Sequence, residues 1–125
     1  MPIRDFRDLA VWNKSIDLAV DVYELTRQFP REERFGLTSQ LRRATTSIST
    51  NIAEGSGRGT TRDLVNFLTM SRGSLREAQS LLVLSRRLDF IQQTELERTF
   101  GCGDDIVRML GRLRSNLLAL AQKGR

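Results

Sequence analysis

Glu54 and Glu77 lie in two different long helical segments and are the side chains best suited to acid–base or metal chemistry. Carboxylates on facing helices hold the metals of di-iron bundle proteins, but those sites also use a Glu-x-x-His motif. The chain has no histidine, which removes this ligand set and the Ser-His and Cys-His nucleophile pairs. We therefore expect no catalytic residue, no metal and no cofactor, and we interpret both glutamates as partners of arginines.

Cys102 is the only cysteine, and it lies between two glycines. A single cysteine cannot form a disulfide within the chain, and without histidine the usual zinc sites lack ligands. A thiol of this kind most often serves as a small packing residue. We interpret Cys102 in that way and not as a nucleophile.

Arginine is the more informative residue, because it makes up 18 of the 20 basic side chains in a chain of net charge +5. Residues 36–87 carry eight arginines against three acids, whereas residues 1–35 sum to −1 and residues 88–125 to +1. The guanidinium group suits bidentate phosphate contacts, although GC-rich codon usage also favours arginine. The candidate phosphate-contacting residues are Arg42, Arg58, Arg62, Arg76, Arg86 and Arg87.

The second predicted helix carries a polar stripe that is short-chained and amide-rich in its middle, which is unusual for a solvent-facing stripe: Arg43, Ser47, Asn51, Glu54 and Arg58. Arg43 lies eleven residues before Glu54, and Arg72 lies five before Glu77, so each acid has an arginine available. A buried amide such as Asn51 tends to fix helix register or oligomeric state. We predict a structural polar network at a helix junction or subunit interface, formed by Gln40, Arg43, Asn51, Glu54, Arg72 and Glu77.

Four segments with helical periodicity must position these side chains, and no segment alternates as a strand would. We expect helices over 8–28, 37–56, from Thr60 to about residue 88, and from Thr94 onward, with Thr60/Asp63 and Thr94/Glu97 as caps. The glycine-rich stretch 55–59 lacks a P-loop lysine and is interpreted as a turn. Short connections make neighbours antiparallel. The prediction is an all-α, antiparallel up-and-down four-helix bundle, a single domain over residues 1–125.

Two apolar stripes run along the first predicted helix, Leu9/Trp12/Ile16/Ala19/Tyr23 and Leu18/Val22/Leu25/Phe29. We expect Trp12 to be largely buried, and glycines 101, 103 and 111 to allow close packing of the fourth helix. Apolar residues left exposed would mark an interface, and the expected ones are Val11 with Leu18, Leu81 with Leu84, and Ile91. The first twenty residues are too polar for a secretory signal, so we expect a soluble cytoplasmic protein with no membrane partner.

Four sequence blocks together resemble a known family. They are residues 6–12 (FRDLxVW), 29–44 (FPxEERFGLTxQLRRA), 47–55 (SIxxNIAEG) and 72–77 (RGSLxE). In this order they resemble the bacterial four-helix-bundle proteins called S23 or 23S ribosomal RNA intervening-sequence proteins, over nearly the whole chain. The chain departs from that pattern at Ser49-Thr50, where a proline usually follows the isoleucine, and at Ala78-Gln79, where Leu-Glu is common.

The resemblance implies an all-α subunit that assembles as a ring-like homopentamer with a basic surface. It also implies kinship with the accessory proteins of diversity-generating retroelements, which are similar pentamers that bind a reverse transcriptase and nucleic acid. Five subunits of net charge +5 would carry about +25, which attracts polyanions. We expect a non-enzymatic homo-oligomer that binds RNA or DNA through phosphates. The alternatives are an adaptor for an acidic protein such as a reverse transcriptase, or a purely structural oligomer. Arg108, Arg112 and Arg114 are the next phosphate-contacting candidates.

Overall fold

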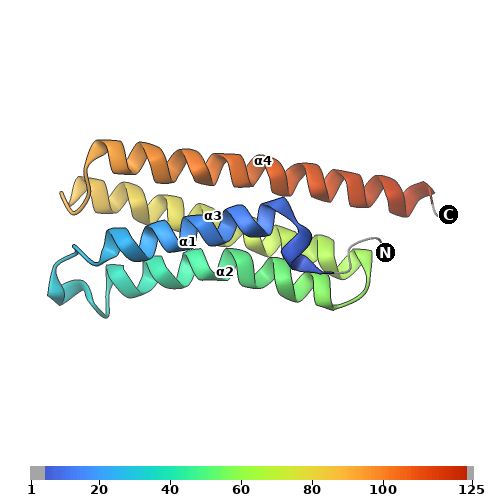
Figure 1. Cartoon of the computed structure of the whole chain (residues 1–125), viewed down its shortest axis with the longest axis horizontal. Coiled ribbons are helices and arrows are strands. Elements are labelled where there is room, and N and C mark those ends of the chain that lie inside the picture. Colours follow the sequence, from blue (N-terminus) through green and yellow to red (C-terminus); the bar gives the residue numbers. More distant parts are fainter. Residues whose placement is uncertain (1–4, 124–125) are drawn as a thin grey trace.

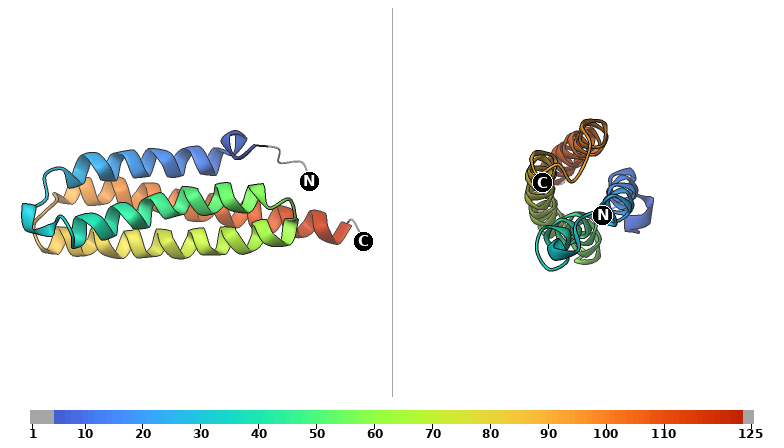
Figure 2. Two further views of the ribbon diagram at one scale, coloured as in Figure 1. Left: turned by 90° about the horizontal axis from the view of Figure 1, so that it is seen from below. Right: turned by 90° about the vertical axis from the view of Figure 1, so that its left-hand side faces the viewer.

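The computed structural model describes residues 5–123 as four long helices that run up and down beside one another (Figure 1). The elements are η1 (Phe6–Asp8), α1 (Ala10–Thr26), η2 (Arg31–Glu33), α2 (Leu37–Gly57), α3 (Thr61–Arg87) and α4 (Gln93–Lys123). No strand occurs among these residues, which confirms the predicted all-α bundle. α4 is the longest helix, and its carboxyl-terminal end extends past the other three (Figure 2). No helix in residues 5–123 combines the length and apolarity needed to cross a membrane.

The amino-terminal ends of α3 and α4 differ in how well the sequence predicts them. Thr60 Oγ1 accepts a hydrogen bond from the Asp63 backbone N–H at 3.1 Å, as predicted. The predicted Thr94/Glu97 box is wrong, because α4 begins at Gln93 and the Gln92 backbone N–H donates to Glu95 Oε1 at 2.8 Å. The capping carboxylate is therefore Glu95, which reaches the backbone N–H three residues before it and starts the helix earlier.

The core lies between α2 and α3 and continues to α1 and α4. The structure confirms the predicted apolar face of α2, which is fully buried: Leu37, Leu41, Ala44, Ile48 and Ile52. It packs against the buried α3 residues Leu64, Leu68, Leu75 and Leu82. Burying such side chains stabilises the fold by about 1.5–3 kcal/mol each. These two helices form the scaffold on which the surface residues are placed.

On α1, the structure buries a different stripe from the one that contains Trp12 and Tyr23. Trp12 is half-buried and packs edge-on against Phe6 at a centroid distance of 4.9 Å, and Tyr23 is 41% exposed. Val11, Leu18 and Ile91 are buried, contrary to the prediction that they stay exposed, whereas Leu84 is exposed and Leu81 is half-buried. The error on α1 arises because two adjacent stripes are apolar and the neighbouring helices select between them.

Two close approaches fix α3 against its neighbours. A Cβ added to Gly55 of α2 would lie 2.5 Å from Phe67 Cβ, and one added to Gly103 of α4 would lie 2.7 Å from Gln79 Nε2. The Ser71 hydroxyl of α3 also donates to the Ile48 carbonyl oxygen of α2. Among the α4 glycines, close packing is therefore confirmed at position 103 and is wrong at 101 and 111, where an added Cβ meets nothing within 4 Å.

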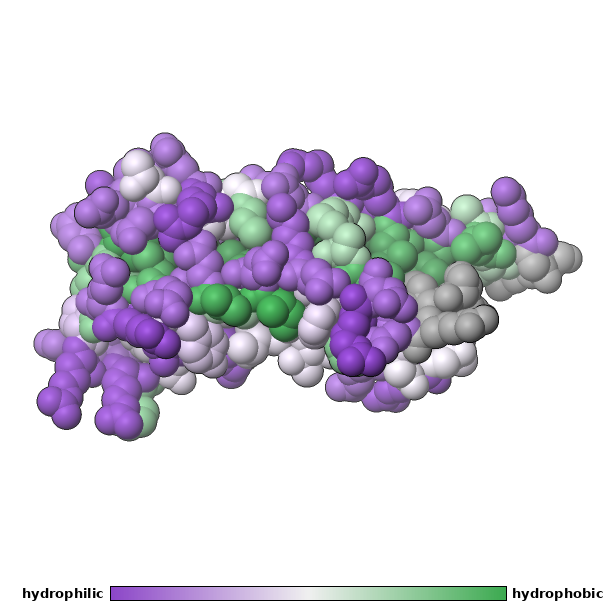
Figure 3. All heavy atoms as spheres, viewed as in Figure 1, coloured by the Kyte–Doolittle hydropathy of each residue, from purple (hydrophilic) through white to green (hydrophobic). Residues whose placement is uncertain are grey.

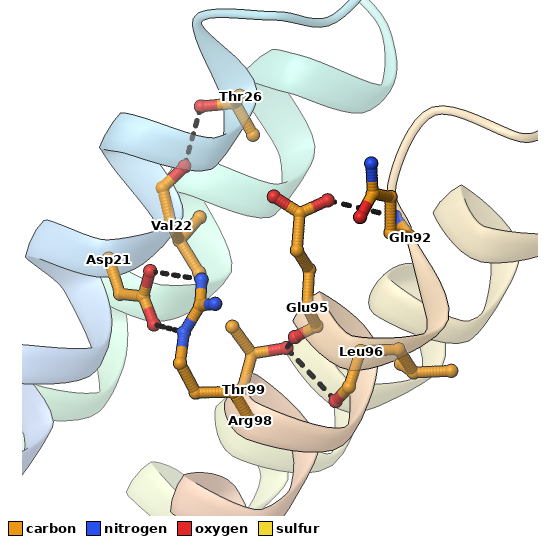
Figure 4. Close-up of polar contacts among 8 residues, drawn as sticks. All are labelled: Asp21, Val22, Thr26, Gln92, Glu95, Leu96, Arg98 and Thr99. Atoms are coloured by element: carbon orange, nitrogen blue, oxygen red, sulfur yellow. Dashed lines mark hydrogen bonds and ion pairs between the residues drawn. The ribbon is translucent and has the colours of Figure 1, made fainter.

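A bidentate ion pair joins α4 to α1 (Figure 4). Arg98 Nε donates to Asp21 Oδ2 at 2.9 Å, and Arg98 Nη2 donates to Asp21 Oδ1 at 2.8 Å. These hydrogen bonds to the Asp21 carboxylate raise the pKa of Arg98. Close by, the Thr99 hydroxyl donates to the Glu95 carbonyl oxygen at 2.8 Å within the first turns of α4. The pair connects the first and last helices at the end of the bundle opposite the chain termini.

Candidate nucleic-acid interface

Ion pairing divides the arginines into two groups. All fifteen aspartates and glutamates lie within residues 5–123, so every side-chain carboxylate of the sequence is placed. Eight of the sixteen arginines in these residues form ion pairs: Arg7, Arg27, Arg43, Arg58, Arg76, Arg86, Arg98 and Arg108. The remaining arginines have guanidinium charges that no placed carboxylate neutralises, and these are the better candidates for contacts with an external anion.

Two of the predicted phosphate-contacting arginines are held by contacts within the chain. Arg42 Nε donates to Thr26 Oγ1 at 2.8 Å, and its guanidinium lies 4.6 Å from the Tyr23 ring centroid. Arg58 Nη2 lies 3.1 Å from Glu54 Oε2 and forms an ion pair one helical turn away. Arg42 therefore joins α1 to α2, and the charge of Arg58 is compensated locally.

Arg76 and Arg86 are also paired with acids. Arg76 Nη1 lies 3.5 Å from Asp104 Oδ1 on α4, and Arg86 Nη1 lies 3.0 Å from Asp89 Oδ1 just beyond α3. A phosphate bound by either guanidinium would have to compete with the carboxylate that already pairs with it.

Arg62 and Arg87 differ from the other predicted arginines, because both are exposed and neither forms an ion pair with any described residue. They lie at opposite ends of α3, and 25 residues of helix separate them by about 37 Å at 1.5 Å per residue. The six predicted residues therefore do not form one continuous binding surface.

The predicted polar network is divided into separate contacts. Arg43 Nη2 on α2 lies 3.1 Å from Glu77 Oε2 on α3, so Glu77 pairs with Arg43 and not with Arg72. Arg43 and Glu54 are eleven residues apart, about 16 Å along one helix, which is too far for a direct pair. Glu54 instead pairs with Arg58.

The amides of the predicted network also lie apart. Asn51 Nδ2 donates to the Ser47 carbonyl oxygen at 2.9 Å and to Ser47 Oγ at 3.2 Å, and Ser74 Oγ of α3 donates to Ser47 Oγ at 3.0 Å. Gln40 is exposed, and no side-chain hydrogen bond joins it to another described residue. The α2–α3 junction therefore contains a small hydrogen-bonded group centred on Ser47, without Gln40.

Further arginines without ion pairs lie at the end of the bundle where the amino-terminal half of α3 packs beside the carboxyl-terminal half of α4. The four acids of α4 all lie in residues 93–105, whereas residues 106–123 contain three arginines, one lysine and no acid. The antiparallel packing brings Arg72 beside Arg114. We define the basic end as Arg62, Arg72, Arg112 and Arg114, which are exposed and form no ion pair with the described residues.

Two hollows open at the basic end. One, of about 230 Å³, lies between α3 and α4, and its lining comprises Leu68, Thr69, Arg72, Leu110, Gly111 and Arg114. The other, of about 320 Å³, is mainly apolar and lies between the start of α1 and α4, with Leu9, Val11, Met109 and Leu113 in its lining. Apolar surface continues on the projecting end of α4, and Figure 3 shows hydrophobic atoms there among hydrophilic ones. The basic end thus combines positive charge with accessible apolar groups.

Cys102 lies outside the basic end. It is half-buried, and burial raises the pKa of its thiol above the ordinary value. Residues 5–123 contain no group of three or more histidine, cysteine, aspartate or glutamate side chains arranged to hold a metal ion.

Comparisons with known proteins identify the family. A search of curated proteins gave no match. A crystal structure from the S23 ribosomal protein family of Bacteroides thetaiotaomicron, a protein of unknown function, superimposes with a TM-score of 0.77 at 24% identity. The similarity covers 84% of this chain and 95% of that one, and it shows a shared fold. The family model for 23S rRNA-intervening sequence proteins matches residues 7–112. The chain therefore belongs to the 23S rRNA-intervening sequence protein family.

Proposed function

We propose that the protein is a non-enzymatic homo-oligomer that binds nucleic acid, with RNA as the first candidate, through phosphate contacts at the basic end. The single observation that carries this proposal is that two exposed arginines without carboxylate partners, Arg72 and Arg114, line one hollow between α3 and α4, at the end of the bundle that also carries Arg62 and Arg112. Eight of the fifteen acids pair with other arginines, so the uncompensated positive charge on these neighbouring helices is available to an external polyanion.

Phosphate contact of this kind needs no base readout. Guanidinium groups neutralise backbone phosphates and release condensed counterions, so affinity is high at low salt and depends little on sequence. The described residues include no exposed aromatic platform at the basic end, since Tyr23 and Phe35 lie elsewhere. We therefore expect weak sequence preference.

The homo-oligomeric part of the proposal is supported by apolar residues on the surface. Phe35 is 87% exposed, and other large apolar side chains are also exposed, among them Val20, Leu84, Leu88, Leu118 and Leu120. Where exposed apolar side chains gather into a large patch, they mark a surface that binds another protein, and we propose that this partner is a second copy of the chain. The ring-like pentamer is proposed on the family resemblance alone.

A second candidate function is favoured by the apolar part of the basic end. Leu118 and Leu120 are exposed on the same stretch of α4 that carries the arginines. An acidic protein partner with apolar anchors, such as a reverse transcriptase, would use both features. A nucleic acid would use the charge alone.

Fluorescence anisotropy of a labelled oligouridylate, titrated with the protein at several salt concentrations, tests the main proposal. A plot of log affinity against log salt concentration should be a straight line with a slope of roughly −0.7 per phosphate contacted. If the four arginines of one subunit each contact one phosphate, the slope should be about −3. Light scattering during size exclusion should give a mass near five subunits. Absence of binding at low salt would contradict the nucleic-acid proposal and favour the acidic partner, and a monomeric mass would contradict the oligomer.

A further inference from the structure

Gly111 lies in the middle of α4, at an exposed position where packing does not require a glycine. A Cβ added there would meet no heavy atom within 4 Å, whereas one added at Gly103 would meet Gln79 at 2.7 Å. Its backbone is helical, so it needs no positive φ. Glycine in a helix interior is less favourable than alanine by about 1 kcal/mol. Contacts within the described chain therefore give no reason for glycine at position 111.

The surroundings of Gly111 are positively charged. Arg72 of α3 and Arg114 of α4 line the same hollow of about 230 Å³, and no carboxylate is part of its lining. Neither guanidinium forms an ion pair with a described residue, although every aspartate and glutamate of the sequence is placed. Two like charges that share one hollow repel each other, and an anion placed between them would turn this repulsion into attraction.

The size and walls of the hollow indicate what kind of anion fits. Its volume is below the roughly 300–1,000 Å³ of ordinary small-molecule and cofactor sites. Leu68 and Leu110 form an apolar lining that is almost entirely buried, which strengthens charge-assisted hydrogen bonds nearby. Arginine binds the oxygens of a phosphate group in bidentate fashion. One phosphate group between two arginines matches this charge and volume.

We infer that the hollow at Gly111 seats a single backbone phosphate of the bound nucleic acid, held between Arg72 and Arg114. The missing Cβ of Gly111 lets the phosphate approach the surface of α4, which is a recurrent use of glycine at ligand sites. This contact would fix the position of the strand, while Arg62 and Arg112, at the same end of the bundle, add to its electrostatic attraction. The inference rests on the proposed function and names its positioning contact.

Gly111→Ala and Gly111→Leu test the inference, with Gly101→Ala and Gly101→Leu as matched controls. Gly101 lies in the same helix and is also exposed, and an added Cβ there likewise meets nothing within 4 Å, but it lies in the acidic half of α4. Both alanine variants should melt at higher temperature than the parent protein, which shows that they fold. For labelled oligouridylate, Gly111→Ala should lose about threefold in affinity and Gly111→Leu about tenfold or more, with both Gly101 variants unchanged.

The outcomes separate this inference from the function on which it rests. If Gly111→Leu binds oligouridylate as tightly as the parent protein, and with the same salt dependence, the phosphate site at Gly111 is wrong while the proposed function still stands. A changed oligomeric mass of Gly111→Leu in light scattering would also overturn the phosphate site, because a second copy of the chain would then fill the hollow. No RNA binding by the parent protein at low salt would overturn both. If Gly111→Leu loses the same factor in affinity for oligouridylate and for a single-stranded DNA of the same length, recognition of the phosphate is supported.

Discussion

Gln79 of α3 fills the space that the missing Cβ of Gly103 leaves in α4. Its Nε2 donates to the Phe100 carbonyl oxygen and to Asp104 Oδ1, each at 3.1 Å, and the residue is only 3% exposed. Arg76 Nη1 donates to Gln79 Oε1 at 2.7 Å. A buried amide with both ends satisfied is specific to one helix register. This contact therefore fixes how α3 lies along α4, and with it the position of Arg72 opposite Arg114.

Gly103→Ala should destabilise the protein by about 1–3 kcal/mol, because Gln79 must move and leave buried polar groups unpaired. The same substitution at Gly101, where nothing opposes a Cβ, should stabilise it by up to about 1 kcal/mol. Chemical denaturation of the two variants and the parent protein measures both changes. Equal effects at the two positions would contradict the close approach at Gly103.

The Asp21–Arg98 pair should contribute little to stability despite its bidentate geometry. Both side chains are partly exposed, and such pairs contribute about 0.2–1 kcal/mol. A double-mutant cycle with Asp21→Asn and Arg98→Gln should give a coupling free energy in that range, and it should shrink at high salt. A coupling well above 1 kcal/mol would show that the pair is desolvated, for instance by a neighbouring subunit.

Trp12→Ala should cost less than the roughly 3–5 kcal/mol expected for a fully buried tryptophan, because Trp12 is half-buried and lies over Phe6 at the edge of the core. We expect about 2 kcal/mol in the free energy of unfolding. Leu75→Ala, at a fully buried position, is the comparison and should cost about 2–5 kcal/mol. A loss above 3 kcal/mol for Trp12→Ala would indicate that oligomer formation buries the rest of the indole.

The Cys102 thiol should react slowly. Burial raises its pKa, so at pH 8 it is protonated to a greater extent than a free thiol and the reactive thiolate is scarcer. Labelling with a disulfide reagent should be at least about tenfold slower than that of free cysteine, and denaturant should remove the difference. Because the neutral form is favoured in the folded state, stability should fall as the pH rises above the ordinary thiol pKa. A labelling rate equal to that of free cysteine would contradict the buried position.

The sequence predicts the architecture well, because a repeated apolar stripe and short connections leave few alternatives. The α2 stripe from Leu37 to Ile52 is a clear case, since only one face of that helix is apolar. On α1 the prediction fails, because adjacent stripes are both apolar and the positions of α2 and α4 decide which one is buried. Local periodicity cannot give that information.

The ion pairs between surface residues are also hard to predict, because local periodicity does not show how neighbouring helices lie against each other. The partnership of Arg43 with Glu77 depends on the register between α2 and α3, which sequence separation does not give. The absence of acids from residues 106–123 is visible in the sequence, and it could have indicated α4 as part of the basic surface. That Arg72 faces the same hollow as Arg114 follows only from the antiparallel packing of α3 against α4.

The central claim is that the basic end, and not the overall charge, binds nucleic acid. The most direct test compares oligouridylate binding by two variants that lose the same charge, Arg72→Gln/Arg112→Gln/Arg114→Gln at the basic end and Arg31→Gln/Arg34→Gln/Arg87→Gln at the opposite end. All six arginines are exposed, and none forms an ion pair with a described residue. The first variant should lose most of its affinity, and its slope of log affinity against log salt should become shallower by roughly 0.7 per lost phosphate contact. The second variant should bind nearly as tightly as the parent protein, with a similar slope. Equal losses in the two variants would contradict the claim.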